Sequence, residues 1–179
     1  MSNSPVTIVR AGRGDAEALS EVAAATFPLA CPPRSTAADI AAFVSEWLSP
    51  ERFGEYLTDP TRTVLKAVSD GRIVGYSLLH TAEPANPDVA AVITLRQVTE
   101  LSKMYVLPGH HGDGVSAGLM SAVLETARNA GNAAVWLGVN QENVRAQRFY
   151  SKHGFEIAGT KTFLVGTQTH SDYVMQYKF

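Results

Sequence analysis

The sequence has one cysteine, few charged residues and no long hydrophobic run, and each shortage excludes a class of protein. Cys31 is the single cysteine in 179 residues, so neither an internal disulfide nor a multi-cysteine metal site can form. Charged residues make up 18% of the chain, and their net charge of -2 gives no broad attraction for nucleic acid or an anionic membrane. The chain also lacks a run of about 18 apolar residues and a basic-then-apolar leader. We therefore expect a cytoplasmic protein without nucleic-acid or membrane partners, in which Cys31 packs as an inert apolar side chain.

The remaining composition suits one globular domain that spans residues 1–179. Hydrophobic residues make up 45% of the chain, which is enough for a covered core, and a second full domain has no room. Turn residues and hydrophobic spacing predict the elements of the N-terminal half. These are a strand at Val6–Arg10, a helix from Asp15 to Phe27 ended by Pro28, a helix capped by Ser35, a short helix or turn after Pro50, a hairpin of Arg62–Val68 and Arg72–His80, and a surface loop from Thr81 to Arg96.

Strands and helices alternate in the second half of the chain. A strand, a crossover helix and a strand, flanked by hairpins, predict a mixed sheet with helices on its faces, which is an α/β fold in the loose sense. The expected elements are a strand at Thr99–Leu107, a helix at Val115–Ala130, a strand at Ala133–Val139, a helix at Glu142–His153 and two final strands around Thr160–Gly166 and Asp172–Met175.

The segment from Met104 to Ala117 joins a strand, a glycine-bearing loop and the start of a helix. Glycine lets the main chain approach a ligand closely, and the unpaired N–H groups at a helix start attract anions. The segment therefore suits a phosphate group, although glycines that only form a turn would give the same pattern.

Two other motifs overlap this loop and fit it less well. Residues 112–117 match the dinucleotide pattern G-x-G-x-x-A, but the next strand ends at Asn140 instead of the required acid. Residues 114–118 match G-x-S-x-G, which would make Ser116 a hydrolase nucleophile with His153 or His170 as its base. An elbow serine lies directly at a strand end, whereas Ser116 lies well past it, so the hydrolase is a remote alternative.

The same segment resembles the acetyl-CoA-binding core of the GNAT N-acetyltransferases, whose loop pattern is R/Q-x-x-G-x-G/A. The pattern falls on residues 111–116, with His111 in place of Arg or Gln and Ser116 in place of Gly or Ala. The resemblance implies that the pantetheine of acetyl-CoA follows the strand and that its pyrophosphate lies on the loop. The residues that it assigns to this co-substrate are Met104, Tyr105, Val106, His111, Gly112, Asp113, Gly114, Val115, Ser116 and Ala117.

A second, more specific motif follows one strand later. Residues 143–155 are similar to the family segment N-x-x-A-x-x-F-Y-x-x-x-G-F. The spacing of Asn143, Ala146 and Tyr150 places them on one helix face, where one ligand could touch all three. The resemblance assigns Asn143 to the amide region of the co-substrate. Together the motifs imply the GNAT fold, a mixed and mostly antiparallel sheet of about seven strands with flanking helices.

The resemblance also implies acetyl transfer to an amine, which needs a base, an acid and a donor for the oxyanion. A tyrosine has a reference pKa of about 10 against about 8.5 for a thiol, so Tyr150 is the candidate acid for the leaving thiolate. Glu100 is the candidate base, although a solvated charge at a strand end would look the same. His80 is a second candidate, and Gly138 stands where other family members carry a glutamate. No metal site is expected, because neighbouring histidines such as His110 and His111 seldom share one ion.

The acceptor is predicted from the charge of residues 39–60. Five acids face a single base, Arg52, in this region, which favours a cationic acceptor, although a solvated acidic face gives the same count. The last two strands resemble those of bacterial spermidine/spermine acetyltransferases, so a small polyamine is the expected amine. A protein lysine or N-terminal amine, and a non-catalytic acyl-CoA-binding module, are alternatives, and a homodimer is left open. The acids are Asp39, Glu46, Glu51, Glu55 and Asp59.

Overall fold

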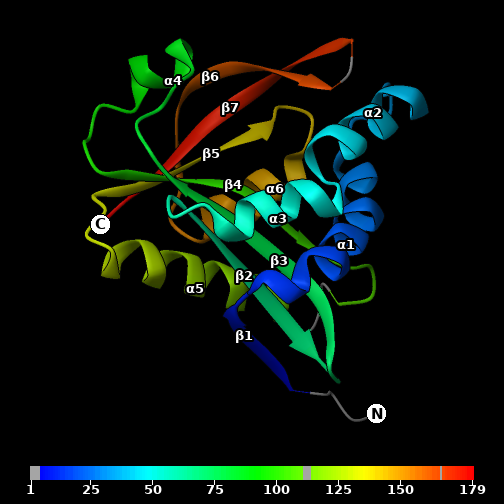
Figure 1. Cartoon of the computed structure of the whole chain (residues 1–179). Coiled ribbons are helices and arrows are strands. Elements are labelled where there is room, and N and C mark those ends of the chain that lie inside the picture. The colour runs from blue at the N-terminus through cyan, green and yellow to red at the C-terminus, as the bar shows by residue number, and fades with distance from the viewer. Residues whose placement is uncertain (1–4, 111–113, 166) are drawn as a thin grey trace.

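One twisted sheet of seven strands runs through the computed structural model, which describes residues 5–110, 114–165 and 167–179 (Figure 1). The strands are β1 (Val6–Arg10), β2 (Arg62–Ser69), β3 (Arg72–Thr81), β4 (Val98–Val106), β5 (Ala134–Asn140), β6 (Glu156–Val165) and β7 (Gln168–Lys178). Their order across the sheet is β1-β2-β3-β4-β5-β7-β6. Within the described residues, β4 and β5 pair in parallel and all other neighbours pair antiparallel. The predicted mixed, mostly antiparallel α/β sheet is therefore confirmed.

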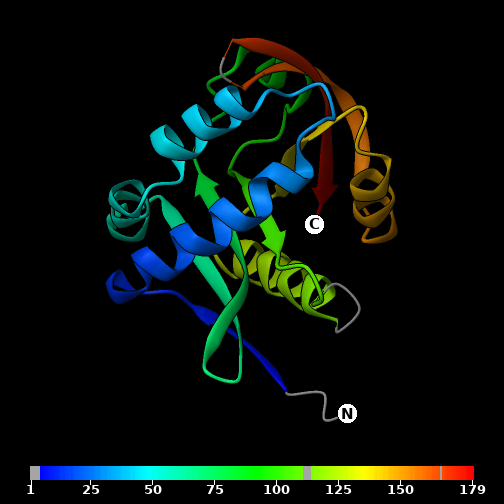
Figure 2. The same ribbon diagram turned by 90° about the vertical axis from the view of Figure 1, so that its right-hand side faces the viewer.

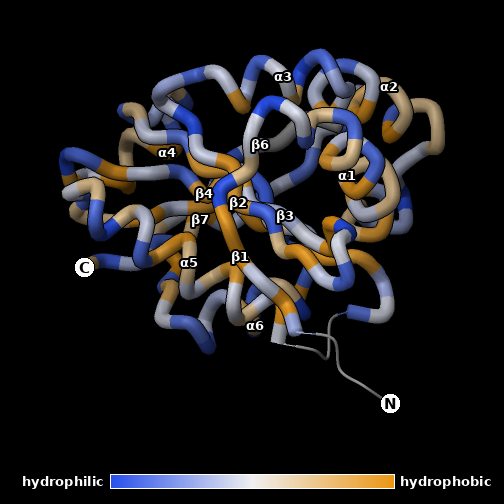
Figure 3. The backbone as a smooth tube through the Cα atoms, turned by 60° about the horizontal axis from the view of Figure 1, so that its bottom comes forward, coloured by the Kyte–Doolittle hydropathy of each residue, from blue (hydrophilic) through white to orange (hydrophobic). Residues whose placement is uncertain are grey.

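Helices cover both faces of this sheet. They are the 3-10 turn η1 (Arg13–Asp15), α1 (Ala16–Ala30), α2 (Ala37–Trp47), α3 (Pro50–Thr58), α4 (Pro87–Val92), α5 (Val115–Asn129) and α6 (Val144–Lys152). The first three α-helices lie on one side, while α5 and α6 lie on the other (Figure 2). The tube coloured by hydropathy shows hydrophobic residues gathered in the central strands (Figure 3). Each face of the sheet thus forms its own core layer.

Apolar side chains of the covering helices fill the two main core layers. Leu119, Met120 and Val123 of α5 are fully buried against one face of the sheet. Leu19 of α1 and Phe53 of α3 are fully buried against the other face. Burying a large apolar side chain contributes about 1.5–3 kcal/mol, so these positions fix the helices on the sheet.

The hairpin of β2 and β3 forms as its turn residues predict. Asp70 and Gly71 have φ angles of 51° and 73°, the left-handed conformation that a two-residue hairpin turn requires. The strands then pair in register from Ser69 opposite Arg72 to Arg62 opposite His80, with one irregularity after Ala67.

Three local predictions are wrong, and the first two concern the ends of helices α1 and α2. Helix α1 does not end at Pro28 but continues to Ala30, because a proline removes only its own N–H hydrogen bond and the helix needs just two more residues beyond it. The N-cap of α2 is Thr36 and not Ser35, since the Thr36 hydroxyl accepts a hydrogen bond from the Asp39 N–H at 3.1 Å.

The expected loop from Thr81 to Arg96 contains helix α4. Asn86 caps this helix by accepting the Asp88 N–H at 2.9 Å, and Pro87 occupies its first position. Val89 is fully buried and helps to anchor it. Six residues are too few to show a helical period in the sequence, so the pattern indicated only a loop.

Candidate active site

The two parallel strands at the centre of the sheet separate after a short paired stretch. β4 and β5 pair only over Val98–Glu100 and Ala134–Trp136 among the described residues. β4 continues to Val106 and β5 to Asn140, so the main chain beyond Glu100 and Trp136 is not bonded across this gap. The opening provides unpaired N–H and C=O groups for a ligand.

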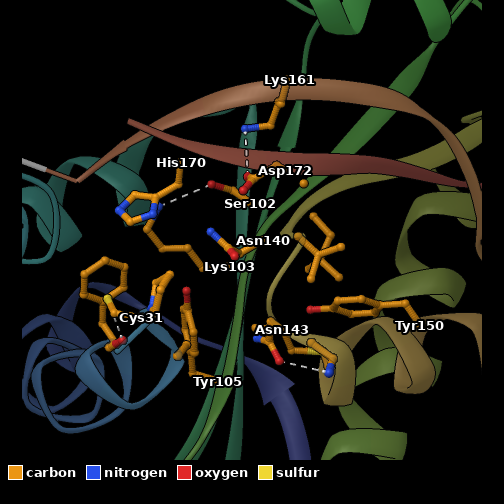
Figure 4. A pocket seen from close by; sticks show the side chains of 18 of the residues that line it. Cys31, Ser102, Lys103, Tyr105, Asn140, Asn143, Tyr150, Lys161, His170 and Asp172 are labelled. Atoms are coloured by element: carbon orange, nitrogen blue, oxygen red, sulfur yellow. Dashed lines mark hydrogen bonds and ion pairs between the residues drawn. The ribbon is translucent and has the colours of Figure 1, made fainter. Parts of the chain in front are cut away.

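A cavity of about 280 Å³ lies at this opening, and we call it the inner cavity (Figure 4). It collects side chains from both halves of the chain. Its lining comprises Phe27, Ala30, Cys31, Pro32, Phe43, Glu100, Leu101, Ser102, Lys103, Met104, Tyr105, Gly138, Val139, Asn140, Asn143, Ala146, Tyr150, Lys161, His170 and Asp172. Both predicted catalytic residues, Glu100 and Tyr150, therefore lie in one cavity.

A bulge in β4 sets which of its side chains face the cavity together. Leu79 pairs with Leu101 and Leu78 with Lys103, so Ser102 is an extra residue on β4. An extra residue reverses the alternation of a strand, and it places Lys103 on the same face as Glu100. The Lys103 ammonium lies 3.4 Å from the Ser102 hydroxyl. Burial lowers the pKa of Lys103 to about 8, while the nearby Glu100 charge acts in the opposite direction.

Helix α6 supplies the opposite wall. Asn143 caps this helix by accepting the Ala146 N–H at 3.1 Å, which leaves its amide N–H₂ toward the cavity side. Asn143, Ala146 and Tyr150 all line the cavity, as their spacing predicts. The Tyr150 hydroxyl points into the cavity (Figure 4), and burial raises the pKa of its phenol to about 12. The phenol therefore keeps its proton at neutral pH. Gly154 follows the helix with φ of 96°, as expected of a C-terminal cap.

Strands β6 and β7 close the cavity above β5. The Lys161 ammonium lies 3.4 Å from Asp172 Oδ2, and both side chains are buried. A Cβ atom at Gly138 would lie 2.5 Å from Lys161 Cε and 3.2 Å from Asp172 Oδ2. The ion pair thus fills the space beside Gly138. Burial raises the pKa of Asp172, and the Lys161 charge opposes this shift.

The segment between α1 and α2 contacts strand β7 through Arg34. An Arg34 guanidinium nitrogen lies 2.8 Å from His170 Nδ1, and the Arg34 carbonyl accepts a hydrogen bond from Gln168 Nε2 at 3.1 Å. Near this point the Asp39 carboxylate accepts the Thr167 N–H at 3.2 Å. The β6–β7 hairpin is therefore fastened to α2, which lies beside it in Figure 1.

A wider groove of about 870 Å³ adjoins the inner cavity, and we call it the outer groove. The two share the side chains of Phe43, Glu100, Ser102, Lys103 and Lys161. The remaining groove residues come mainly from α2, α3 and the start of β2. These are Ala42, Glu46, Trp47, Arg52, Glu55, Tyr56, Asp59, Arg62, Asn86 and Thr162.

Two of the five acids in the predicted acidic face form ion pairs. In the outer groove Glu55 lies 3.0 Å from Arg52, and Asp59 lies 3.3 Å from Arg62. Asp39 and Glu51 do not line the groove. The groove therefore carries acids and bases in near balance rather than a field of one sign.

The predicted co-substrate residues divide into three groups. Met104 and Tyr105 line the cavity, whereas the Val106 side chain is buried in the core and opposite Gly75. Gly114 begins α5 with φ of 74°, and the first helical turn after it holds Val115, Ser116 and Ala117, none of which lines the cavity. His111, Gly112 and Asp113 lie outside the described residues.

The hydrolase alternative finds no support in this arrangement. Ser116 lies inside α5 and no hydrogen bond joins it to a histidine in the described part of the chain. His170 lines the inner cavity, but Ser116 does not. Cys31 does line the cavity, yet burial raises the pKa of its thiol to about 11, so it stays protonated and is a poor nucleophile.

The described residues contain no group of three or more histidine, cysteine, aspartate or glutamate side chains that could hold a metal ion. None of the helices in the described ranges has the length and apolar character needed to cross a membrane.

His80, the second candidate base, lies opposite Glu100 on β3 but lines neither the cavity nor the groove.

The sequence of residues 20–155 matches the Acetyltransferase (GNAT) family. The chain belongs to this acetyltransferase family. It is 53% identical over 161 residues to uncharacterized N-acetyltransferases of Mycobacterium tuberculosis and Mycobacterium bovis, covering 90% of this chain and 96% of theirs. Its fold is similar to that of the PaiA N-acetyltransferase of Thermoplasma acidophilum, solved in complex with coenzyme A, with a TM-score of 0.77. That likeness covers 98% of this chain and 99% of the other at 18% identity.

Sequence reasoning missed the residues that β6 and β7 bring to the site. Lys161 and Asp172 belong to no recognisable sequence motif. The sequence suggests His170 only as a possible base for Ser116 in the hydrolase alternative. The pairing of β7 with β5, which places Asp172 opposite Asn140, was not visible.

Proposed function

We propose that this acetyltransferase moves an acetyl group from acetyl-CoA to a primary amine of a small molecule. The observation that carries the proposal is the inner cavity itself. It joins the unpaired main chain of β4 to the Tyr150 hydroxyl and to the carboxylate of Glu100. A donor, an acid and a base thus surround one space of about 280 Å³, which suits a thioester end and a small amine.

The residues present fit acetyl-CoA. Gly114, in its left-handed conformation, opens α5 with free N–H groups, which suit a diphosphate. The free main chain of β4 at Met104 and Tyr105 suits the amide groups of a pantetheine, and the Asn143 amide faces them from α6. When bound, acetyl-CoA supplies the acetyl group as a thioester. The coenzyme A in the similar PaiA structure supports this assignment.

Each chemical task has a group in the cavity. A main-chain N–H of β4 can donate to the carbonyl oxygen of the acetyl group as negative charge grows on it. Glu100 stands at the end of the paired stretch and can accept a proton from the amine directly or through water. Tyr150 holds a proton at its hydroxyl oxygen and can give it to the leaving sulfur.

A polyamine is the first acceptor to test. The acids of residues 39–60 support a cationic amine, and three of them, Glu46, Glu55 and Asp59, line the outer groove. Glu55 and Asp59 already pair with Arg52 and Arg62. The charge of the groove therefore favours a cationic amine in general and not a polyamine in particular. A peptide N-terminus or lysine is the second choice.

The test is a panel of amines assayed for release of free CoA from acetyl-CoA. Polyamines, amino alcohols, amino acids and a lysine peptide should be compared at equal concentration. Transfer to at least one small amine, with mass spectrometry of the acetylated product, would support the proposal. Acetyl-CoA binding without transfer to any amine would point to a non-catalytic acyl-CoA-binding module instead.

A further inference from the structure

We propose that β7 supplies the acceptor-binding pair of this enzyme, with Asp172 receiving the amine and His170 donating to an oxygen of the same molecule. The acceptor class would then be a small primary amine that carries a hydroxyl, carbonyl or carboxylate oxygen a few bonds away. The inference rests on the proposed acetyl transfer and narrows its acceptor.

Asp172 offers a buried acceptor to the cavity. The residue is 4% exposed, and its Oδ2 lies 3.4 Å from the Lys161 ammonium. Its second oxygen, Oδ1, is buried and has no hydrogen-bond partner among the described residues. A carboxylate oxygen left unpaired in this way costs free energy, and an N–H group of a bound amine would restore the missing bond.

His170 offers a buried donor to the same cavity. It is 1% exposed, and its Nδ1 lies 2.8 Å from an Arg34 nitrogen. A guanidinium can only donate, so Nδ1 must accept and the proton of the neutral ring lies on Nε2. That Nε2–H is buried and, in the described part of the chain, has no partner. It needs an acceptor atom such as an oxygen.

The two unpaired groups face one small ligand. Residues 170 and 172 are two positions apart on β7, so their side chains lie on the same face with Cα atoms about 7 Å apart. Both line the inner cavity, where Tyr150 points in from the opposite wall (Figure 4). The spacing fits a molecule whose amine and oxygen are separated by a few bonds.

The other polar groups of the cavity point to the same ligand chemistry. Lys103 and Lys161 add ammonium donors, and the Lys103 ammonium is within reach of one hydroxyl at 3.4 Å. The positive charges of the two lysines balance the negative charges of Glu100 and Asp172. The cavity therefore has no excess negative charge that would attract a doubly charged amine such as a polyamine. A polyamine offers only N–H groups and would leave the His170 donor unpaired.

Three acceptors of similar size test the inference. 3-Amino-1-propanol and n-butylamine differ by a hydroxyl in place of a methyl group, and 1,4-diaminobutane represents the polyamines. We expect kcat/KM for the amino alcohol to exceed that for n-butylamine and for the diamine by about tenfold or more, because only its oxygen pairs with the buried N–H. Equal use of all three, or a preference for the diamine, would overturn the inference.

Two substitutions at His170 separate its donor from its structural role. His170→Asn keeps an oxygen near the position of Nδ1 for Arg34 and removes the Nε2–H, so the preference for the amino alcohol should fall to near parity. His170→Gln returns an N–H near the position of Nε2, so part of the preference should remain. A preference unchanged in His170→Asn would contradict the assignment.

Asp172→Asn tests the amine side. It should raise the KM for 3-amino-1-propanol about tenfold or more and leave the affinity for acetyl-CoA unchanged. The matched control is Asp15→Asn, because Asp15 pairs with Lys66 at 3.0 Å outside the cavity. The inference fails if Asp172→Asn behaves like this control.

Failure of the inference can be told from failure of the proposed function. Calorimetry that detects no binding of acetyl-CoA to the wild-type protein would refute the acetyl transfer itself. Binding of acetyl-CoA together with transfer to none of the three amines would overturn the acceptor inference alone. Thermal melting of each variant shows whether a lost activity comes from unfolding.

Discussion

The Tyr150 hydroxyl shows how the cavity changes the chemistry of a single residue. Burial raises its pKa to about 12. A buried phenol with this pKa is fully protonated across the range in which enzymes are assayed. It is therefore a constant proton source for a sulfur whose own reference pKa is about 8.5.

Tyr150→Phe removes this proton source without changing the ring. We expect kcat to fall by about 10- to 1000-fold, with nearly unchanged affinity for acetyl-CoA, because the ring still packs between α6 and the cavity. Steady-state kinetics with calorimetry for acetyl-CoA measure both quantities. Tyr177→Phe, a tyrosine outside the cavity that packs on Phe155, is the control and should retain kcat. Unchanged kcat in Tyr150→Phe would reject the acid role.

Glu100→Gln tests the base in the same way. If Glu100 accepts the amine proton, kcat/KM should fall by about 10²- to 10⁴-fold and the acid limb of its pH profile should disappear or move. Glu125→Gln on α5 changes a carboxylate outside the cavity and should leave the profile unchanged. If the pH profile of the Glu100→Gln variant keeps its acid limb, Glu100 is not the base, and water or another carboxylate accepts the amine proton.

At the scale of elements, the sequence predicts those features that depend on residues a few positions apart. The β2–β3 turn and the α6 cap follow from residues within a few positions, and both form as expected. The place of β7 between β5 and β6 depends on pairing between distant segments, which no local pattern records. For the same reason the motif of residues 143–155 could place Asn143 and Tyr150 on one helix face, while no motif could place Asp172 and His170 beside them.

The start of α5 can be tested with two glycines of matching conformation. Gly114 and Gly71 have φ of 74° and 73°, and a Cβ at either would meet nothing within 4 Å. Alanine at either position should lower the free energy of unfolding by about 1–2 kcal/mol, because L-residues are strained there. Only Gly114→Ala should also raise the Kd for acetyl-CoA, by about tenfold, since it shifts the N–H groups that suit the diphosphate. Equal Kd values in the two variants would remove Gly114 from that site.

At the scale of the whole molecule, the cavity exists only in the folded chain. Its lining runs from Phe27 to Asp172 and comes from α1, α2, β4, β5, α6, β6 and β7. It also holds buried polar atoms that have no partner within the described ranges, including Asp172 Oδ1 and His170 Nε2. Such groups lower the stability of the free protein, so the empty site is costly and ligands that fill it should stabilise the fold.

Acetyl-CoA should therefore raise the melting temperature. A ligand that binds only the folded state at 100 times its Kd adds about 2.7 kcal/mol to the free energy of unfolding. For a chain of this length, about 2–4 °C per kcal/mol gives a rise of roughly 5–10 °C, measured at constant protein concentration. S-acetylpantetheine, which lacks the nucleotide and diphosphate, should produce a smaller rise at the same concentration. Equal shifts would mean that β4 alone holds the ligand, and no shift at millimolar acetyl-CoA would contradict the co-substrate site as a whole.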